Sequence, residues 1–351
     1  MPKIREKLAL RQQFKEYLNG YDLRKEQGMV FIGKEHVSGI LDKNVKAAAV
    51  CESGQTVVFE TRDCYDDGVV SEERPLGDKA DPIENPATGP LYIEGALPGD
   101  ILKVEILDIQ VRNWAVMRSS TSCGVFHEDF SERTARIFKL DNLKQEEAGA
   151  QAVEKAGAAC RGDFRFDDVL KLELDPMIGV IGTAPAGDGI TTDTPDSHGG
   201  NMDCRKIVKG SVLYLPVYAE GALLSMGDLH ALMGDGEVLI CGLETGGAVT
   251  VKVTVLKEKE LKGVRIPVPF LSCRGDVMTI QSARTLDEAG DMAAKAMKEF
   301  VKAAAKKDNL EAGMLMSLLS NMAVCQVVDP LKTVRVEFPL HVLESYGYKL
   351  P

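Results

Sequence analysis

Apolar and polar residues alternate along several short segments of the chain, and a period of two is typical of β-strands with one buried face. The clearest case runs from Leu102 to Ile106, where Lys103 and Glu105 separate the apolar positions. Runs rich in β-branched and aromatic residues predict further strands at 56–61, 90–96, 211–217, 249–255, 276–280 and 334–338. The pattern therefore predicts a mainly β protein with a sandwich or barrel-like core.

The hydrophobic period lengthens to that of a helix near the end of the chain. Thr285 and Glu288 fit a capping box, and apolar residues then recur at helical spacing up to Ala304. A second helix is predicted after Asp308. We expect residues 281–351 to form an α+β part, with C-terminal helices, that packs on a β-rich core over 36–280.

Two further segments break the β pattern. Apolar residues at helix-like spacing near the start of the chain predict an N-terminal helical cap over 1–35. A polar tract of Ala, Glu, Gln and Lys at 143–159 indicates an exposed helix or an insertion near 131–170. Neither segment carries residues with a recognisable chemical role.

Charge and composition exclude several classes of partner. The chain has 42 Lys and Arg against 53 Asp and Glu, a formal net charge of −11, so a nucleic acid would be repelled by most of its surface. No segment approaches the ~20 apolar residues that span a bilayer, and the first residues lack a signal-peptide core. The eight cysteines form no Cys-x-x-Cys pair. We expect a cytoplasmic protein that binds neither nucleic acid nor membranes.

Two of the five histidines, His198 and His230, fall within glycine-rich acidic segments. Asn201 and Asp203 follow the first histidine, and Asp228 stands two residues before the second, on the same face if the segment is extended. Imidazole and carboxylate groups together are typical ligands of zinc, whereas the spacing does not match a calcium-binding EF-hand loop. The alternative is that these loops cap strands and that the histidines bond to backbone groups.

Three other residues are candidates for chemistry. Glu94 adjoins an apolar strand, where burial would raise its pKa and suit it to proton transfer. Asp63 opens a polar loop, although Arg62 could pair with it. Cys204 is a possible nucleophile, but Arg205 is its only cationic neighbour in the sequence.

Several long motifs resemble those of the acetamidase/formamidase family. They are the run from Asn85 to Asp100, the run from Pro176 to Pro185, His198-Gly199-Gly200-Asn201-Met202-Asp203, the segment from Gly227 to Glu237, and Gln326-Val327-Val328-Asp329-Pro330. The resemblance covers most of residues 36–340. The chain departs from the family pattern at Asn321, where members usually carry an acidic residue.

The resemblance implies a metal-dependent hydrolase that cleaves short aliphatic amides to a carboxylate and ammonia. His198, Asp203 and His230 would hold a divalent metal, expected to be zinc with calcium as the weaker alternative, and Asp63 would belong to the same metal site. Amide resonance makes the carbonyl carbon a poor electrophile, which is why a Lewis acid is expected.

The catalytic roles fall to three further residues. Glu94 would move the proton from water to the leaving amine, Asp228 would orient the metal ligands, and Asn201 would donate to the developing oxyanion. Two alternatives remain open, a cysteine-dependent amidase that uses Cys204 and a non-catalytic β protein that binds a metal or small ligand. The helical C-terminal part offers a surface for a homodimer.

Overall fold

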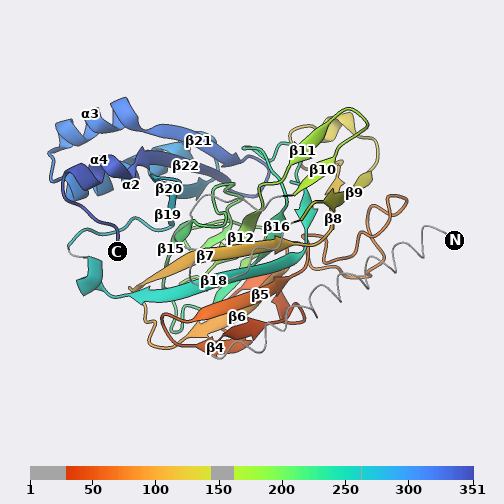
Figure 1. Cartoon of the computed structure of the whole chain (residues 1–351), viewed down its shortest axis with the longest axis horizontal. Coiled ribbons are helices and arrows are strands. Elements are labelled where there is room, and N and C mark those ends of the chain that lie inside the picture. The colour runs from red at the N-terminus through yellow and green to blue at the C-terminus, as the bar shows by residue number, and fades with distance from the viewer. Residues whose placement is uncertain (1–28, 144–161, 262) are drawn as a thin grey trace.

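The computed structural model describes residues 29–143, 162–261 and 263–351, and its described part is built mainly from two large β-sheets (Figure 1). Strands β7 (Ile101–Val111) and β18 (Gly247–Leu256) pair antiparallel along ten registered positions and form the centre of the first sheet. On β7 the apolar positions of the alternating sequence pattern are buried. The sandwich prediction is therefore confirmed.

The first sheet has nine strands in the order β1-β5-β18-β7-β15-β19-β20-β22-β21. Its other members are β1 (Val30–Ile32), β5 (Thr56–Thr61), β15 (Val212–Pro216), β19 (Phe270–Cys273), β20 (Asp276–Ala283), β21 (Asn321–Gln326) and β22 (Lys332–Pro339). Because β20 pairs with β22, this sheet runs without interruption into the C-terminal part of the chain.

The second sheet has eleven strands and carries the functional residues described below. Its strands are β2 (Val37–Ser38), β4 (Ala49–Cys51), β6 (Ala87–Ile93), β8 (Trp114–Arg118), β9 (Ala135–Asp141), β10 (Asp163–Arg165), β11 (Lys171–Glu173), β12 (Met177–Gly182), β14 (Gly199–Asn201), β16 (Leu224–His230) and β17 (Glu244–Thr245). Strands β3 (Ile40–Leu41) and β13 (Ile190–Thr191) form a separate pair.

The main hydrophobic core lies between the two sheets. Phe59, Leu102 and Val251 of the first sheet and Ile178 and Leu229 of the second belong to one cluster of fully buried side chains. Burying a side chain of this size contributes about 1.5–3 kcal/mol. The inner face of the second sheet is thereby held rigidly, which matters because its strands position the site.

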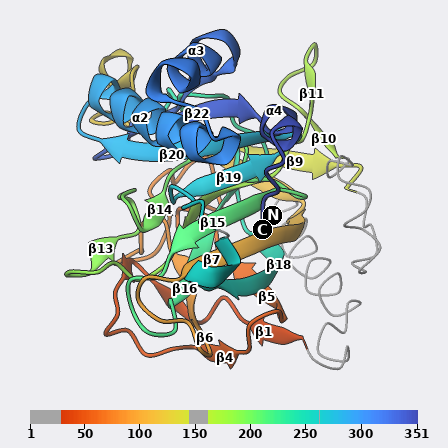
Figure 2. The ribbon, with the colours of Figure 1, turned by 90° about the vertical axis from the view of Figure 1, so that its left-hand side faces the viewer.

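A second core lies between the far half of the nine-stranded sheet and the C-terminal helices, which cover one face of it (Figures 1 and 2). The helices are α2 (Leu286–Ala305), α3 (Asn309–Leu319) and α4 (Leu340–Ser345). Thr285 caps α2 by accepting from the Glu288 N–H, and Asp308 and Glu311 form a capping box at α3. The predicted C-terminal helices are therefore confirmed.

Some sequence predictions meet the structure only in part. The strand predicted at 90–96 is β6, which begins and ends three residues earlier, and 97–100 form the expected turn. The predicted cap over 1–35 lies outside the described residues up to 28, and residues 30–32 are strand β1. The tract at 143–159 likewise lies almost wholly outside them, whereas β9 and β10 flank it.

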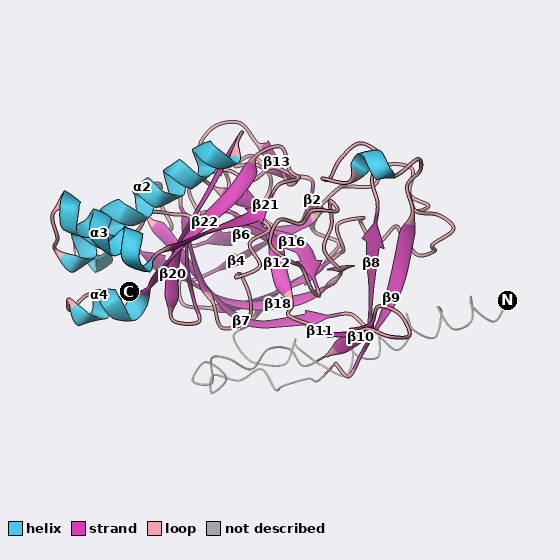
Figure 3. Cartoon of the chain, turned by 90° about the horizontal axis from the view of Figure 1, so that it is seen from above, coloured by secondary structure: helices cyan, strands magenta, loops and turns pink. Residues whose placement is uncertain are grey.

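Seen from above, the helices and the β8–β9 hairpin lie at opposite ends of the molecule (Figure 3). Short 3-10 helices occur at His127–Asp129 and Glu258–Leu261. Of the helices in the described residues, none is both long enough and apolar enough to cross a membrane.

Candidate functional site

Strand β16 carries Asp228 and His230, both fully buried, in the middle of the second sheet. His230 pairs across the sheet with Met177 of β12 and Glu244 of β17. Its Nε2 lies 3.3 Å from Asp228 Oδ1 and 3.2 Å from Glu244 Oε1. The sheet register thus brings one imidazole between two carboxylates, one of them 14 residues further along the chain.

Three more carboxylates complete what we call the carboxylate cluster: Asp203, Asp228, Glu237, Glu244 and Asp329, arranged around His230. Asp203 Oδ1 lies 3.8 Å and Glu237 Oε1 3.9 Å from His230 Nε2. Carboxylate oxygens of Asp203, Glu237 and Asp329 lie within 4.8 Å of one another. Five acidic groups and one imidazole therefore share a small buried volume.

The glycine at position 179 makes room for the cluster. A Cβ atom added to Gly179 of β12 would lie 2.5 Å from Asp203 Oδ1 and 2.6 Å from Asp228 Oδ2. Both distances are closer than non-bonded atoms allow. Only a residue without a side chain lets these two carboxylates approach the strand.

Three residues of the carboxylate cluster have a strained backbone. Asp203, Asp228 and Glu237 have φ values of 44°, 53° and 49°, in the left-handed region that non-glycine residues seldom adopt. Each such residue costs of order 1–3 kcal/mol unless its surroundings favour it. Acidic residues outside the cluster, Asp66 and Asp67, have similar φ values of 58° and 56°, so the strain alone does not assign a function.

Burial and mutual repulsion disfavour the charged form of the carboxyl groups. Burial, opposed by His230 and assisted by Asp228, raises the pKa of Glu244 to about 8. Burial and the charge of Asp228 raise the pKa of Asp203 to about 6. Burial lowers the pKa of His230, but the carboxylates of Glu244 and Asp228 outweigh it and raise that pKa well above its usual value.

Within the described part of the chain, several oxygens of the cluster have no hydrogen-bond partner. Both carboxylate oxygens of Asp203, Oε2 of Glu244 and Oδ1 of Asn201 are buried without one. Buried polar atoms are nearly always paired, so such a group of orphaned oxygens needs an explanation. Carboxylate oxygens and an imidazole nitrogen are the donor set of divalent cations, and these residues fit one chemically.

The cluster lies beside a cavity of about 530 Å³. Asp228, Glu237, Glu244, Asp329 and Asn201 line part of its wall. Its volume is within the range of about 300–1,000 Å³ typical of small-molecule sites. A ligand in the cavity can therefore reach the cluster directly.

The structure separates His198 from the other predicted metal-site residues. His198 is fully buried, both its ring nitrogens lack a partner, and burial lowers its pKa to about 4 despite the nearby charge of Asp196. No group of potential metal ligands among the described residues includes it. The expectation that His198 and His230 converge on one ion therefore stays a prediction, and the grouped ligand atoms of the described residues do not support it.

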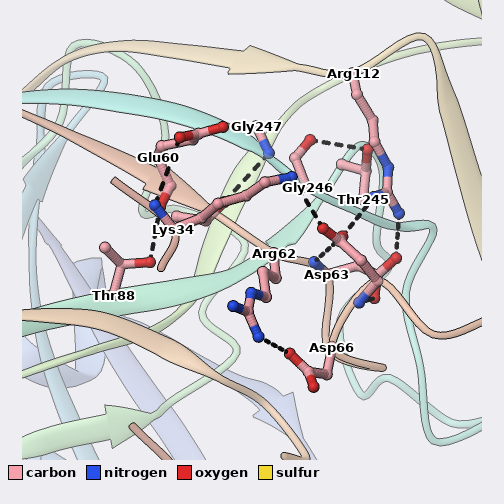
Figure 4. A network of polar contacts seen from close by, with 12 residues as sticks. Lys34, Glu60, Arg62, Asp63, Asp66, Thr88, Arg112, Thr245, Gly246 and Gly247 are labelled. Atoms are coloured by element: carbon pink, nitrogen blue, oxygen red, sulfur yellow. Dashed lines mark hydrogen bonds and ion pairs between the residues drawn. The ribbon is translucent and has the colours of Figure 1, made fainter. Parts of the chain in front are cut away.

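Asp63 is also engaged elsewhere. Its carboxylate faces the guanidinium of Arg112 (Figure 4) and accepts hydrogen bonds from the backbone N–H groups of Tyr65 and Asp67, at 3.0 and 2.8 Å. Arg112 also lies 2.6 Å from Asp67, which pairs with Lys34 at 3.1 Å. These four charged residues form what we call the ion-pair network, and the predicted place of Asp63 in the metal site is wrong because its oxygens are already bonded.

Of the other predicted site residues, two line the cavity and two do not. Asn201 and Asp228 line the cavity, and Asn201 Nδ2 donates to Asp329 Oδ2 at 3.0 Å. Glu94 is exposed on the turn after β6 and does not line the cavity, so its predicted burial is wrong. Cys204 is fully buried and is absent from the cavity wall. The thiols that do line the cavity are those of Cys64 and Cys123.

Sequence reasoning missed the roles of Glu244 and Asp329. Asp329 stands in the motif Gln326-Val327-Val328-Asp329-Pro330, and Glu237 ends the quoted segment that begins at Gly227. Asp235, two residues before Glu237, forms an ion pair with Arg335 at 2.6 Å. The motifs therefore contained a usable signal for Asp329 and Glu237. Glu244 follows a short apolar stretch, and nothing near it in the sequence indicates that it pairs with His230.

The two-sheet sandwich and the buried carboxylate–imidazole cluster at the cavity wall define the class of protein. It is a β-sandwich with a small-molecule site built from ionisable side chains. The chain belongs to the acetamidase/formamidase family, whose sequence model matches residues 34–192 and 183–304. The resemblance drawn from its motifs is thereby confirmed.

Individual relatives agree with this assignment. The crystal structure of an acetamidase from Bacillus halodurans is similar, with a TM-score of 0.80 and 42% identity over 91% of this chain and 100% of that one. A formamidase from Methylophilus methylotrophus is 28% identical over 58% of this chain, and an acetamidase from Mycolicibacterium smegmatis is 27% identical over 61%. These alignments cover 60% and 64% of the two curated relatives, less than two thirds of their length.

Proposed function

We propose that this protein is a metal-dependent hydrolase that cleaves short aliphatic amides to a carboxylate and ammonia. The observation that carries the proposal is the set of orphaned carboxylate oxygens beside a ligand-sized cavity. The names of the relatives, formamidase and acetamidase, support small amides as the substrate class.

Asp203, Asp228 and His230 are the residues proposed to hold the cation, since one ligand atom of each lies within 4.8 Å of the others. A divalent cation bound there would polarise the amide carbonyl, activate water and lower the pKa of nearby carboxyl groups. The imidazole favours zinc, whereas carboxylate oxygens also suit calcium and manganese. We propose zinc and include the other two metals in the test.

Glu244 is proposed as the group that moves the proton, in place of Glu94. Its Oε1 accepts from the Gly242 N–H at 2.7 Å, which fixes the carboxyl group, while Oε2 has no partner. The free oxygen can take a proton as water adds to the amide carbon and give it to the nitrogen as the C–N bond breaks. One N–H of Asn201 bonds to Asp329, and the other can donate to the oxyanion.

The test is ammonia release from formamide and acetamide before and after removal of metal by a chelator. We expect activity to vanish with the metal and to return with zinc, and manganese and calcium are added in parallel. In His230→Ala, metal content measured by elemental analysis should fall, whereas His341→Ala, on the exposed surface of α4, should keep it. Full activity of the metal-free protein would refute the proposal.

The cysteine-dependent alternative is disfavoured by position, because Cys204 is fully buried and does not line the cavity. Two thiols line the cavity, Cys64 and the exposed Cys123. Burial, Glu244 and Asp228 raise the pKa of Cys64 well above its usual value, so this thiol is held protonated. Loss of activity on thiol alkylation, but not on chelation, would revive this alternative. Ligand-dependent stabilisation without ammonia release would favour the non-catalytic one.

A cytoplasmic homodimer remains the prediction for the protein's location and assembly. Leu310, Met314 and Leu318 recur every four residues on the exposed side of α3, and Met322 on the edge strand β21 is also exposed. An apolar stripe of this kind suits a contact between subunits. Sedimentation of the purified protein at several concentrations tests the assembly.

A further inference from the structure

The cavity is much larger than formamide or acetamide requires. Acetamide has only two carbons, one oxygen and one nitrogen, whereas about 530 Å³ suits a considerably larger ligand. Apart from the carboxylate cluster, the cavity wall includes Arg118 and Arg133. The size and charge of this wall point to a substrate with a second polar end.

The strand register places the two arginines on one face. Arg118 pairs with Ala135 between β8 and β9, and backbone and side-chain hydrogen bonds between Ser119 and Thr134 extend this pairing by one residue. Side chains two residues apart on a strand share a face, so Arg133 projects to the same side as Arg118. Diagonal neighbours of this kind lie about 7–8 Å apart, and long side chains can meet across that gap.

Neither arginine has an acidic partner. The guanidinium carbon of Arg118 lies 4.2 Å from the centre of the Tyr65 ring and Nη1 lies 3.4 Å from the Pro75 carbonyl oxygen. In the described part of the chain, no carboxylate lies within 4.0 Å of Arg118 or Arg133, although Arg112 and Arg335 each pair with two. Two unpaired like charges on one cavity wall provide a site for an anion.

We propose that the physiological substrate is an amide whose acyl chain ends in a carboxylate, with the amide at the carboxylate cluster and the carboxylate at Arg118 and Arg133. This inference rests on the proposed function. A guanidinium presents its N–H donors in a fork that matches the two oxygens of a carboxylate. The stacked Tyr65 ring holds Arg118 in place, which reduces the entropy lost on binding.

Other charged groups on the wall restrict where the anionic end can lie. Lys332 Nζ already donates to the Asp329 carbonyl oxygen at 2.7 Å. Glu84 and Asp193 would repel a carboxylate, and Asp193 Oδ1 accepts from the hydroxyls of Thr191 and Thr194. The face that carries Arg118 and Arg133 is therefore where the anionic end binds.

The experiment compares malonamate, succinamate and glutaramate with neutral counterparts in which a methyl ketone replaces the carboxylate. Ammonia release from the metal-loaded protein gives kcat/KM for each. A hydrogen bond to a charged group contributes about 1.5–3 kcal/mol, so we expect kcat/KM to favour the anionic amide by about 10- to 100-fold for at least one chain length.

Variants assign the effect to the two arginines. In Arg118→Gln and Arg133→Gln, this preference for the anionic amide should shrink by at least about tenfold, mainly through KM. Arg136→Gln is the matched control, because Arg136 follows Ala135 on β9, stacks on Phe138 and Phe166 and does not line the cavity. The control should keep the preference.

The outcomes separate this inference from the proposed function. Hydrolysis of neutral amides with no preference at any chain length would overturn the inference and leave the amide hydrolase intact. Equal losses on both substrate series in the arginine variants would also overturn it, because that result indicates a structural role. If no amide is hydrolysed by the metal-loaded protein, both proposals fall.

Discussion

Two groups of charged residues, one partly buried and one buried, differ in how their charges are compensated. In the ion-pair network, the carboxylates of Asp63 and Asp67 are matched by Arg112, Lys34 and backbone N–H donors. In the carboxylate cluster, five acidic residues share one imidazole, and several oxygens have no partner. A buried charge is tolerated only when it is paired, so the cluster is incomplete without protons or a cation.

The pKa values of Asp67 and Glu244 express this difference, although at Asp63 burial outweighs Arg112 and raises the pKa. Burial raises the pKa of Asp67, but Arg112 and Lys34 outweigh it and lower the pKa to about 2, so this carboxylate stays charged. In the cluster, the pKa of Glu244 rises to about 8. The network also fixes the loop that carries Cys64 and Tyr65 to the cavity wall. The ion-pair network supports the cavity wall, and the carboxylate cluster lines it with oxygens that lack partners among the described residues.

The largest effect is expected when the network is broken. Arg112→Met leaves Asp63, which is fully buried, without its cation, and breaking a buried pair in this way costs about 3–5 kcal/mol. The free energy of unfolding from urea titration measures it. Arg74→Met is the control, because Arg74 and Asp78 form an exposed pair whose loss should leave the free energy of unfolding almost unchanged. Equal losses in the two variants would show that the network is not energetically special.

Gly179→Ala should disturb the carboxylate cluster without replacing any of its residues. The added methyl group overlaps the positions of Asp203 Oδ1 and Asp228 Oδ2, so both carboxylates must move. A displacement of about 1 Å in a catalytic site can lower activity about 10²-fold. Amide hydrolysis and metal content measure the effect. Gly187→Ala, where an added methyl meets no atom within 4 Å, should change neither, and normal activity in Gly179→Ala would mean that the cradle is not needed.

Local signals in the sequence predicted local structure well. Thr285 and Asp308 cap helices where their spacing with Glu288 and Glu311 indicates, because capping involves only neighbouring residues. The prediction that Asp228 and His230 lie together is also confirmed, since two residues on one strand suffice to bring them near.

Contacts between distant segments were not predictable in this way. Glu244 reaches His230 only through the pairing of β17 with β16, and Asp63 is held by Arg112, 49 residues away. Sheet register is set by the whole hydrophobic pattern and by the turns, so no single motif contains it. For the same reason Glu94, which looked buried beside an apolar strand, lies on an exposed turn.

Glu244→Gln should separate the activity of the cluster from its stability. Removing the proposed proton carrier should lower kcat by about 10²–10⁴-fold. In the metal-free wild type, the folded carboxyl group has its pKa raised from 4.5 to about 8, so folding loses stability as the pH rises through this range. Glutamine does not titrate, so the metal-free variant should gain stability relative to the metal-free wild type as the pH rises from 5 to 8.

Chemical denaturation of the two metal-free proteins at pH 5 and pH 8 checks the sign. The advantage of Glu244→Gln should be larger at pH 8, and an advantage that is larger at pH 5 would contradict the assigned titration. Glu94→Gln serves as the control, because Glu94 is exposed and lies off the cavity wall. It should retain both activity and stability, and a large loss of activity there would restore Glu94 as the catalytic carboxylate.

The smallest effect concerns His198, whose titration changes stability with pH in the direction opposite to that of Glu244. Burial lowers its pKa to about 4, so the folded protein holds it neutral while the unfolded chain binds a proton below pH 6.5. Stability is therefore lost as the pH falls from about 6.5 to about 4, by about 1 kcal/mol at pH 5.5. In His198→Met this contribution disappears. All other titratable groups are the same in both proteins, so the difference between their changes in the free energy of unfolding from pH 7.5 to pH 5.5 measures it. Metal content should be unchanged in the variant, since His198 lies outside the cluster, and a loss of metal would return this histidine to the ligand set.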